Sequence, residues 1–593
     1  MSDPKTVFLD AAPSVHALKE SFTRLLNAYL RETGQSRSVS GTSHTGYTLR
    51  AELPHTGFTA YGVLYHVSSG GHHMFGDLFH IEHRGQRQDI SLEALSEMLV
   101  EEISHAESDP AARMRKKEEL ERLLRNSQQH MAGYFSHFLK KLDFDLDFRT
   151  CEQLLLAGHP FHPTPKSLEG FTSEDSRTYS PEYQTSFALH GFAIARSHLA
   201  EDWLSPDSAG HDAPWIPEAI RQAAQNKLAH QLDHYALLPC HPWQANYLLS
   251  LSPIQELLRN QILIDLGATG PVVYPTSSVR TVWNAEDNCF YKLSLHIRIT
   301  NFIRENNMEQ LLRTHDAAKI VQRVCEESHL PPFFRILLDK GYRTVRIPDA
   351  DQQINDVVTA GFSMIMREAP NACVDPARPP FVIASLLEIP PGGSKPFLFR
   401  AVLESMNGAQ PDWLLWFQKY LDIALKPVLD LFTGKGISLE AHVQNSMLGL
   451  EGGMPSVFYI RDLEGISVNL DLARTNGWIG TLVDEDSPVL YSEAEARKRL
   501  KYYFFVNHLS HLIQRLAICS GHEEQSFWLA VRKTLQQMIV QAEHAYLSIV
   551  LNDLLESDTL PAKANLLSRF HKRGEKPLYV DIPNPIKHAA LTL

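Results

Sequence analysis

Cysteine is scarce in this sequence, and long apolar runs are missing from it. Six cysteines are scattered among 593 residues with no CxxC pair. This pattern argues against a disulfide framework and a cysteine-based zinc site, and it favours a reducing compartment. No stretch of 18 or more apolar residues occurs, so we expect no membrane span. Residues 1–5 lack a basic region followed by an apolar one, so we expect no secretory signal and predict a cytoplasmic protein.

Positive charge is in deficit, and several familiar motifs are missing. The chain has 56 Lys and Arg against 69 Asp and Glu, a net charge of −13, which argues against general nucleic-acid binding. There is no Walker A pattern (GxxxxGK[ST]), no GxGxxG and no GxSxG. A nucleotide bound by this protein must therefore be held in an unfamiliar way.

Apolar residues are present in sufficient number for real cores. They make up 44% of the chain, and the length predicts three or four domains of mixed α+β structure. A polar stretch at 173–182 and the breaker-rich run at 390–396 predict boundaries between residues 1–175, 176–395 and 396–593. The residue patterns further predict helices over 13–33, 109–142, 411–433, 492–519 and 523–555, a hairpin within 57–83, a strand pair within 438–463 and an extended tail at 578–585.

The densest group of reactive side chains lies in residues 274–304. It combines two adjacent serines and several threonines with the cations Arg280, Lys292, Arg298 and Arg304. A triphosphate is bound by this mixture, because hydroxyls and turn amides hold its oxygens while Arg and Lys neutralise its charge. In an acidic chain such a cationic segment is a local feature and not a consequence of composition.

Within this segment, Lys292 and one arginine are the candidate catalytic cations. Residues 289–295 read as a strand, and a Lys that projects from a strand beside phosphates serves phosphoryl and adenylyl chemistry. The alternative is an outward-facing surface Lys. Arg298 and Arg304 are six residues apart. If this stretch is helical, they do not share one face well, so we select Arg304, which follows Asn301.

Two proline-containing turns carry histidines. Between residues 158 and 170, Gly and Pro fix a rigid loop from which His159, His162 and Lys166 could point at an anion. The alternative is a structural turn whose histidines bond to the backbone. For the second turn, His241-Pro-Trp-Gln, we favour a structural role, because a buried Trp is more often core than a ligand contact.

A polar segment near residue 440 is the candidate metal site. Alternation over 438–445 predicts a strand with Glu440, His442 and Gln444 on one side. Asn445 and Asp462 follow in an order similar to the kinase arrangement in which Asn and Asp hold metal against phosphates. The His-Arg-Asp signature of kinases is absent. Three inward polar side chains are costly without a ligand, so we favour a functional site over a satisfied polar hairpin.

These motifs, in this order, resemble the aerobactin synthetase (IucA/IucC) family, which builds siderophores without a nonribosomal peptide synthetase. The resemblance spans about residues 150–585, and the first 130 residues match only in general character. The residues that carry it are His159, His162, Lys166, His241 with the Pro-Trp-Gln that follows, residues 276–281, Lys292, residues 298–304, residues 440–445, Arg461 and Asp462.

The resemblance implies a cupped-hand architecture of thumb, fingers and palm, with a distantly kinase-like palm and a helical C-terminal part. It also implies a reaction of ATP, Mg²⁺ and a carboxylic acid, usually citrate. An acyl-adenylate forms, pyrophosphate leaves, and an amine or hydroxyl compound attacks to give an amide or ester. The implied protein is a homodimer that uses neither nucleic acid nor membrane.

The same resemblance implies residue roles. The implied catalytic residues are Arg304, His442 and Lys292. The implied ATP-binding residues are Ser278, Arg280, Thr281, Lys292, Gln444, His162 and Lys166. The implied substrate-binding residues are Arg304, His442 and His159. The implied Mg²⁺ ligands are Glu440, Asn445 and Asp462.

The carboxylate substrate separates the branches of the family. Residues 292–304 are more similar to the branch that uses free citrate than to those using α-ketoglutarate or an already mono-amidated citrate. Two other classes of function stay open at this point. One is a kinase-like phosphotransferase that makes ADP, and the other is a noncatalytic protein that binds a carboxylate or ferric siderophore.

Overall fold

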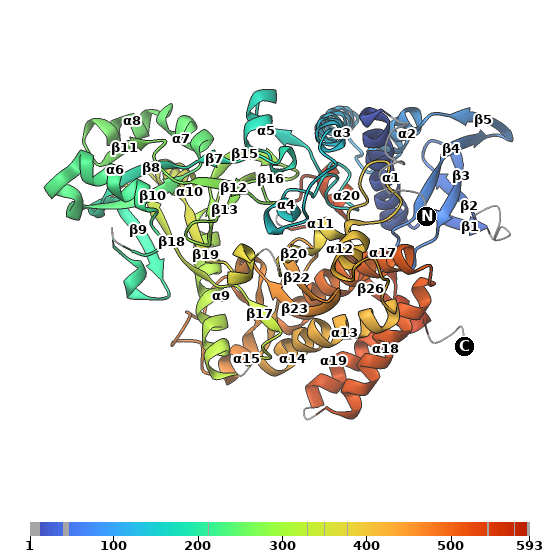
Figure 1. The fold of residues 1–593 in the computed structure, drawn as a ribbon. Helices are drawn as coiled ribbons and strands as arrows, with labels where there is room; N and C mark the ends of the chain where they lie inside the picture. The colour runs from blue at the N-terminus through green and yellow to red at the C-terminus, as the bar shows by residue number, and fades with distance from the viewer. Residues whose placement is uncertain are drawn as a thin grey trace.

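The computed structural model describes residues 12–589, with gaps at 40–46, 211–212, 329, 349, 376–377, 543–544 and 575. Helices and sheets are mixed along the whole described chain, as the α+β prediction requires. In Figure 1 the N-terminal unit lies on one side, a sheet-rich middle unit on the other, and the helical C-terminal part below. In the described part of the chain, no helix combines the length and apolarity needed to cross a membrane.

The N-terminal unit is a five-stranded antiparallel sheet packed against three helices. The strands are in sequence order, and Leu25, Phe79 and Leu99 are among the buried residues between the layers. The predicted helix over 13–33, hairpin within 57–83 and long helix over 109–142 are confirmed. The elements are α1 (Pro13–Thr33), β1 (Ser36–Val39), β2 (Tyr47–Leu53), β3 (Phe58–His66), β4 (Met74–His83), β5 (Gln86–Ile90), α2 (Leu92–Ser104) and α3 (Pro110–Leu139).

The middle unit is built on a seven-stranded sheet in the order β7-β12-β13-β14-β19-β18-β9. Strand β14 lies at its centre, so both faces of this strand are covered and all five of its residues are buried. The strands of this sheet are β7 (Phe187–Ala188), β9 (Leu199–Trp203), β12 (Val272–Pro275), β13 (Thr281–Asn284), β14 (Cys289–Leu293), β18 (Asp339–Val345) and β19 (Met364–Glu368).

Two small sheets and several helices complete the middle unit. The sheet β10-β8-β11 packs with α6 and α8, and the sheet β16-β15-β6 adds a hairpin beside β14. Their elements are α4 (Phe148–Glu152), β6 (Leu168–Glu169), α5 (Ser173–Tyr179), β8 (His190–Ala195), α6 (Glu218–Leu228), β10 (Tyr235–Cys240), α7 (Pro242–Leu249), α8 (Ser252–Arg259), β11 (Leu263–Gly267), β15 (Leu295–Ile299), β16 (Phe302–Arg304), α9 (Met308–Glu327) and α10 (Gln352–Phe362).

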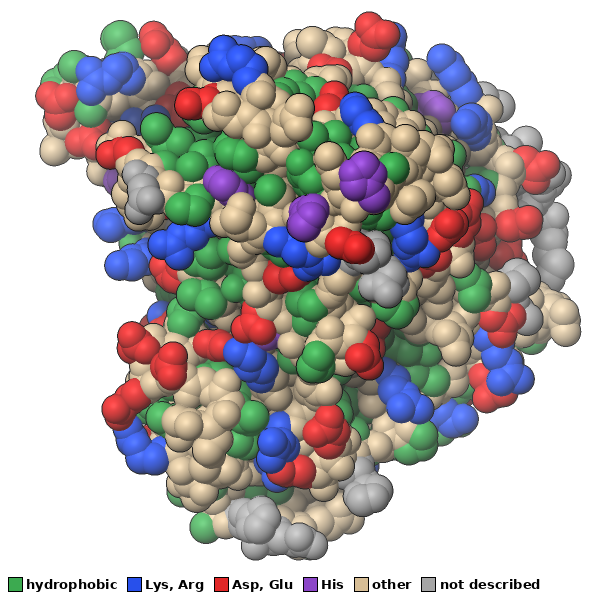
Figure 2. Space-filling view, turned by 90° about the vertical axis from the view of Figure 1, so that its left-hand side faces the viewer, with side chains coloured by type: hydrophobic (Ala, Val, Ile, Leu, Met, Phe, Trp, Pro, Cys, Tyr) green, Lys and Arg blue, Asp and Glu red, His purple; other side chains and the backbone are tan. Residues whose placement is uncertain are grey.

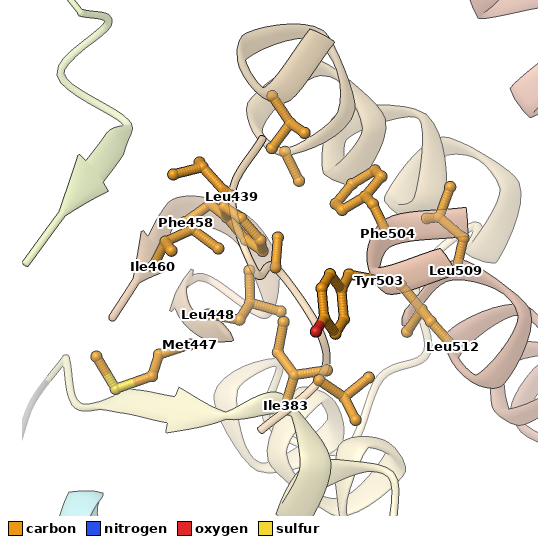
Figure 3. Packing of buried hydrophobic residues seen from close by; sticks show 14 of the residues in the cluster. Ile383, Leu439, Met447, Leu448, Phe458, Ile460, Tyr503, Phe504, Leu509 and Leu512 are labelled. Atoms are coloured by element: carbon orange, nitrogen blue, oxygen red, sulfur yellow. The ribbon is translucent and has the colours of Figure 1, made fainter. Parts of the chain in front are cut away.

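The C-terminal part packs a four-stranded sheet, β17-β23-β22-β20, against helices, and strands β17 and β20 of this sheet come from residues before 396. Figure 3 shows part of its core, which includes Met447 and Leu448 of β22, Phe458 of β23, and Phe504 and Leu512. The elements are β17 (Phe334–Ile336), β20 (Pro380–Val382), α11 (Ile383–Leu386), α12 (Phe397–Ser405), α13 (Trp413–Ile423), α14 (Leu425–Lys435), β21 (Ile437–Ser438), β22 (Ser446–Glu451), β23 (Met454–Ile460), β24 (Ser467–Asn469), α15 (Leu470–Thr475), β25 (Leu490–Tyr491), α16 (Glu493–Leu500), α17 (Ser510–Ser520), α18 (Glu524–Val540), α19 (Ala545–Glu556), β26 (Thr559–Lys563), α20 (Asn565–Phe570), β27 (Tyr579–Pro583) and α21 (Pro585–His588).

Two segments have a structure that the sequence left open, and one local prediction is wrong. Residues 173–179 form helix α5 because Thr172 and Asp175 build a capping box at its start. Residues 298–304 form the hairpin β15–β16 and not a helix. The predicted strand over 438–445 ends at Ser438, and residues 440–445 form a turn stabilised by the hydrogen bond from Asn445 N to His442 O.

A nine-residue π-helical segment, Lys501–Leu509, joins α16 to α17. Such segments are rare and frequently occur at functional sites. Its residues brace the 440–445 turn, because Nδ1 of His508 lies 2.8 Å from the carbonyl of Ala441. The side chain of Tyr503, labelled in Figure 3, comes from the same segment.

The C-terminal segment returns to the N-terminal unit. Leu566 and Phe570 of α20 are buried in the same cluster as Phe22 and Leu25 of α1, and α1 and α20 lie side by side in Figure 1. The two ends of the described chain therefore share one hydrophobic core.

Candidate active site

Lys292 lies at the centre of a buried ion-pair cluster. It is on β14, and the register of the sheet places it opposite Thr281 on β13. Its Nζ donates to Oδ1 of Asp462 at 2.7 Å and to Oε2 of Glu464 at 2.8 Å. The side chain of Lys292 is only 3% exposed. The interpretation of Lys292 as a surface residue is therefore wrong.

Two arginines complete this group. Arg367 on β19 donates from Nε to Oδ1 of Asp339 at 2.7 Å, and its Nη2 lies 3.2 Å from Oδ1 of Asp462. Nη2 of Arg280 lies 3.7 Å from Oε2 of Glu464. We call Arg280, Lys292, Arg367, Asp462 and Glu464 the Lys292 cluster.

The cations of the Lys292 cluster keep its carboxylates ionised. Burial by itself raises the pKa of Asp462, but the charges of Lys292 and Arg367 outweigh it and hold that pKa well below its usual range. Burial likewise opposes ionisation of Glu464, and Lys292 and Arg280 lower its pKa. The cluster thus contains permanent charges of both signs around a buried lysine, with the two carboxylates partly exposed.

The turn from β12 to β13 presents the predicted phosphate-binding hydroxyls beside this cluster. Thr276 N donates to the carbonyl of Thr281 at 2.9 Å, and Thr281 N donates to Oγ of Ser278 at 3.2 Å. Val279 at the tip has a φ of 68°, which a β-branched residue rarely adopts. The turn brings Ser278, Arg280 and Thr281 near Lys292, because Thr281 lies opposite Lys292 in the sheet.

Arg304 stands at the end of β16 with unused hydrogen-bonding capacity. Its Nη2 donates to the carbonyl of Ile299 at 3.1 Å and to Oγ1 of Thr300 at 3.2 Å. Its Nε is buried and has no hydrogen-bond partner in the described structure. Burial and the nearby Arg280 lower the pKa of Arg304 to about 10. A buried cation with a free donor is suited to an anionic ligand.

His442 is held in one tautomer by the 440–445 turn. Its Nδ1 accepts hydrogen bonds from Gln444 N and Asn445 N, each at 3.2 Å. The proton of the neutral ring is therefore assigned to Nε2. Burial lowers the pKa of His442, so the ring is neutral near pH 7 and presents an N–H donor.

Gln444 links this turn to the phosphate turn. Its Nε2 donates to the carbonyl of Ser277 at 3.1 Å. Arg461 donates to the carbonyl of Gln444 at 3.1 Å and forms a buried, two-contact ion pair with Glu152. Glu152 also accepts from Ser277 N at 3.3 Å. One buried carboxylate therefore ties together two turns that lie far apart in the sequence.

The histidines of the 158–166 loop are neutral, with His162 buried and His159 half-buried. Burial lowers the pKa of His162 to about 4, and its Nε2 lies 3.3 Å from Oδ1 of Asn301. Burial also lowers the pKa of His159 well below its usual range, and its Nε2 lies 3.0 Å from Nδ2 of Asn507. Lys166 forms a buried ion pair with Glu182, which already neutralises its charge.

The three predicted Mg²⁺ ligands come from two segments. Asn445 Nδ2 donates to the backbone carbonyl of Glu440 at 3.3 Å, whereas Asp462 is bound to Lys292 and Arg367. Among the described residues, no group of three or more His, Cys, Asp or Glu side chains is arranged to hold a metal ion. The carboxylate that the structure does bring next to Asp462 is that of Glu464.

Several residues of the site were missed at the level of sequence. For Glu464 there was a signal, since it follows Asp462 by two positions; the others come from distant strands and helices that the sequence alone does not bring together. The missed residues are Glu152, Asn306, Asp339, Arg367, Glu464, Tyr503, Asn507 and Lys563.

Comparison with protein-family models matches this chain in two places. Residues 147–388, which hold the phosphate turn, Lys292 and Arg304, match the model described as the IucA / IucC family. Residues 414–578, which hold the 440–445 turn and Asp462, match the model described as a ferric iron reductase FhuF-like transporter.

Named relatives match nearly the whole chain. The L-2,3-diaminopropanoate–citrate ligase of Staphylococcus aureus is 34% identical over 97% of this chain and 96% of its own length. The spermidine-citrate ligase of Bacillus anthracis is 28% identical over 96% of this chain and 97% of its own length. These relatives are ligases, and this chain is likewise an enzyme of the ligase class. It belongs to the IucA/IucC family.

Solved structures share the fold. ATP-bound aerobactin synthetase IucA from Klebsiella pneumoniae superimposes with a TM-score of 0.81 at 25% identity, over 96% of this chain and 99% of that one. Petrobactin biosynthesis protein AsbB from Bacillus anthracis gives a TM-score of 0.78 at 16% identity, over 98% of this chain and 97% of that one, and shows the fold alone.

Proposed function

We propose that this protein is an ATP-dependent siderophore synthetase that joins a carboxylate of citrate to an amine or hydroxyl compound. The observation that carries the proposal is the Lys292 cluster, in which buried cations and carboxylates lie beside a hydroxyl-bearing turn and beside Arg304, whose Nε has no partner in the described structure. Relatives named as citrate ligases match the chain over nearly its whole length.

The reaction has two steps. An oxygen of a citrate carboxylate attacks the α-phosphorus of ATP; the bond from that phosphorus to its bridging oxygen breaks, and pyrophosphate leaves with the electron pair. The lone pair of the amine or hydroxyl then attacks the acyl carbon, the carbon–oxygen bond to AMP breaks, and AMP leaves with the electron pair. One proton of the nucleophile is released. The carboxylate is already anionic, so the first step needs no base.

The residues of the site divide between phosphate and citrate. Ser278, Arg280, Thr281 and Lys292 bind the phosphates, since cations and fixed donors stabilise the charge that develops at phosphorus. We also assign Gln444, His162 and Lys166 to ATP binding. Because Lys166 is bound to Glu182, its role is to hold the 158–166 loop in place.

Citrate meets the α-phosphate between Arg304, His442 and His159. Arg304 supplies a cation for a trianionic substrate, and its buried Nε is a free donor. His442 supplies an Nε2–H donor and not a base, because its Nδ1 accepts two backbone N–H groups. Both side chains therefore stabilise negative charge without moving a proton.

Mg²⁺ fits the chemistry of the donors present. The carboxylates of Asp462 and Glu464 converge on one ammonium, and hard oxygen ligands of this kind suit Mg²⁺. Asp462, with Glu440 and Asn445, holds the ion in our proposal. Bound Mg²⁺ supplies positive charge to the phosphate oxygens and the leaving pyrophosphate.

We propose three domains: a thumb over residues 1–175, fingers over 176–395 and a kinase-like palm over 396–593. One buried cluster that lies wholly within residues 187–364 supports the middle unit. We further propose a cytoplasmic homodimer that uses free citrate and no nucleic acid. On the face in Figure 2, Lys and Arg are interspersed with Asp and Glu, which gives no continuous basic surface.

The products formed from ATP test the proposal. Purified protein is incubated with ATP, Mg²⁺ and either citrate or α-ketoglutarate, with hydroxylamine as a generic acceptor. AMP and pyrophosphate that appear only with citrate are the expected result. ADP would establish a kinase-like phosphotransferase instead. Turnover only with α-ketoglutarate or a mono-amidated citrate would change the substrate class, and no turnover would favour a noncatalytic binding protein.

A further inference from the structure

A second charged group, centred on Lys563, is also a neighbour of His442. Lys563 ends β26, and its Nζ donates to the hydroxyl of Tyr503 at 2.9 Å. The same ammonium lies 5.2 Å from the ring centre of Tyr502 and 4.6 Å from that of Tyr503. Lys563 is half-buried, so its charge is held on two aromatic faces and keeps some access to solvent.

Glu440 and Arg499 face this lysine. Burial and the proximity of Glu440 raise the pKa of the Tyr503 hydroxyl. Arg499 on α16 donates to Oγ of Ser467 at 3.1 Å. We call Glu440, Arg499, Tyr502, Tyr503 and Lys563 the Lys563 cluster.

The charge of Lys563 survives its partial burial. Burial lowers its pKa to about 8, Glu440 opposes this shift, and Arg499, Glu495 and Lys498 are the other charged groups that face it. The ammonium is therefore mostly protonated near neutral pH. In the described structure no carboxylate lies within ion-pair distance of this ammonium. Its hydrogen bond goes to the hydroxyl of Tyr503.

His442 is a neighbour of both clusters. The charges that act on the pKa of its ring include those of Glu440 and Lys563 and that of Asp462. The charged neighbours of Arg304, by contrast, are members of the Lys292 cluster. The acyl group that Arg304 and His442 bind would thus lie near both the phosphates and the Lys563 cluster.

We propose that the Lys563 cluster is the subsite of the acyl acceptor, and that it takes an amine that also carries a carboxylate, such as an amino acid. This inference rests on the proposed function. Lys563 and Arg499 provide cations for the carboxylate of the acceptor. A polyamine without a carboxylate would place its positive charge against Lys563 and would be repelled.

The segment that carries Lys563 is held firmly enough to discriminate between acceptors. Glu32 at the end of α1 accepts hydrogen bonds from Leu566 N and Leu567 N, both at 2.8 Å. Arg569 donates to Glu119 of α3 at 2.9 Å. The N-terminal unit therefore positions this wall of the subsite, although the two matched family models begin only at residues 147 and 414.

Paired acceptors test the proposal. Amide formation from ATP and citrate is measured with 2,3-diaminopropanoate against ethylenediamine, ornithine against 1,4-diaminobutane, and lysine against 1,5-diaminopentane. Each pair differs only by a carboxylate. For the pair whose length suits the site best, we expect kcat/KM to be roughly 30-fold or more higher with the amino acid than with the diamine. A desolvated charge contact has an effect of this size on binding.

Lys563→Met should remove this preference. The variant should form amide with the amino acid more slowly, and its KM for citrate should not change. Lys426→Met is the matched control, since Lys426 is a half-exposed lysine paired with Asp422 on the surface. A wild-type preference for the diamines, an unchanged preference in Lys563→Met, or a large rise in its KM for citrate would overturn the proposal. Absence of citrate-dependent pyrophosphate release in the wild type would instead overturn the proposed function itself.

Discussion

The ammonium of Lys292 donates a 2.7 Å hydrogen bond to Asp462, a residue 170 positions further along the chain. Lys292 belongs to the central strand of the middle unit, and Asp462 follows the sheet of the C-terminal part. Asp462 has a φ of 73°, an uncommon value for a residue with a side chain. The ion pair therefore joins two sheets at the place where we propose that ATP reacts.

Lys292→Ala should lower citrate-dependent pyrophosphate release by about 100-fold or more, since it removes a fixed cation from the phosphates. It should also destabilise the protein by about 3 kcal/mol, because Asp462 and Glu464 lose their shared buried partner. Initial rates and thermal unfolding give the two values. Lys340→Ala is the control, as Lys340 forms a half-exposed pair with Glu368. Near wild-type rates for Lys292→Ala would make the ion pair structural only.

Arg304→Ala and His442→Ala should each lower adenylation by about 100- to 1000-fold while the protein stays folded. Arg304 loses the cation that faces citrate, and His442 loses the Nε2–H donor. His442→Gln should recover part of the activity, because its amide can also donate. Isotope exchange between pyrophosphate and ATP measures the step, and thermal unfolding checks the fold. Exchange at the wild-type rate in either Ala variant would rule out that residue's assignment.

Gly465→Ala should impair the site through Glu440. A Cβ at position 465 would lie 1.6 Å from Oε2 of Glu440, so that carboxylate must move. We expect kcat for amide formation to fall at least 10-fold, or 1.4 kcal/mol in the activation barrier. Gly434→Ala is the matched control, since a Cβ there has no atom within 4 Å. Equal activity of the two variants would show that Glu440 has no part in the reaction.

Stability should fall in acid through buried neutral histidines such as His241. Burial lowers the pKa of His241 to about 3 from a usual 6.5. Between these values the unfolded chain binds a proton that the native state does not, so the free energy of unfolding decreases as pH falls from 6.5. The slope from one such group is about 1.4 kcal/mol per pH unit, and the term vanishes above pH 6.5.

His241→Asn isolates this effect. His241 caps α7 by accepting from Trp243 N at 3.1 Å, and an Asn can accept the same hydrogen bond without titrating. Denaturant unfolding at several pH values between 4.5 and 7.5 should show a shallower pH slope for the variant. Identical slopes in the two proteins would mean that His241 is not a buried neutral group.

Local patterns predicted the regular elements well and the site in part. The periodicity of residues 13–33 and the short apolar run of β14 each gave the element that the structure has, because α1 buries one face and β14 is buried on both. The turn at 440–445 was read as a strand, since its alternating polar residues imitate the period of a strand. The structure shows that the backbone bonds to the ring of His442 there, a contact that no periodicity reports.

The rest of the site depends on contacts between distant segments. Arg367 reaches Asp462 because β19 lies beside β14, and Lys563 reaches Tyr503 because the chain end returns to the π-helical segment. Neither pairing follows from spacing along the sequence. The family resemblance supplied the roles of Arg304 and His442 and is confirmed by the matches to relatives along the chain.

Transfer of oxygen from citrate to AMP tests the account most directly. Citrate labelled with ¹⁸O in its carboxylates is incubated with ATP, Mg²⁺ and an amine acceptor, and the AMP is analysed by mass spectrometry. If citrate attacks the α-phosphorus, each AMP carries one ¹⁸O from the carboxylate. Unlabelled AMP, or label found in phosphate together with ADP, would contradict the acyl-adenylate mechanism.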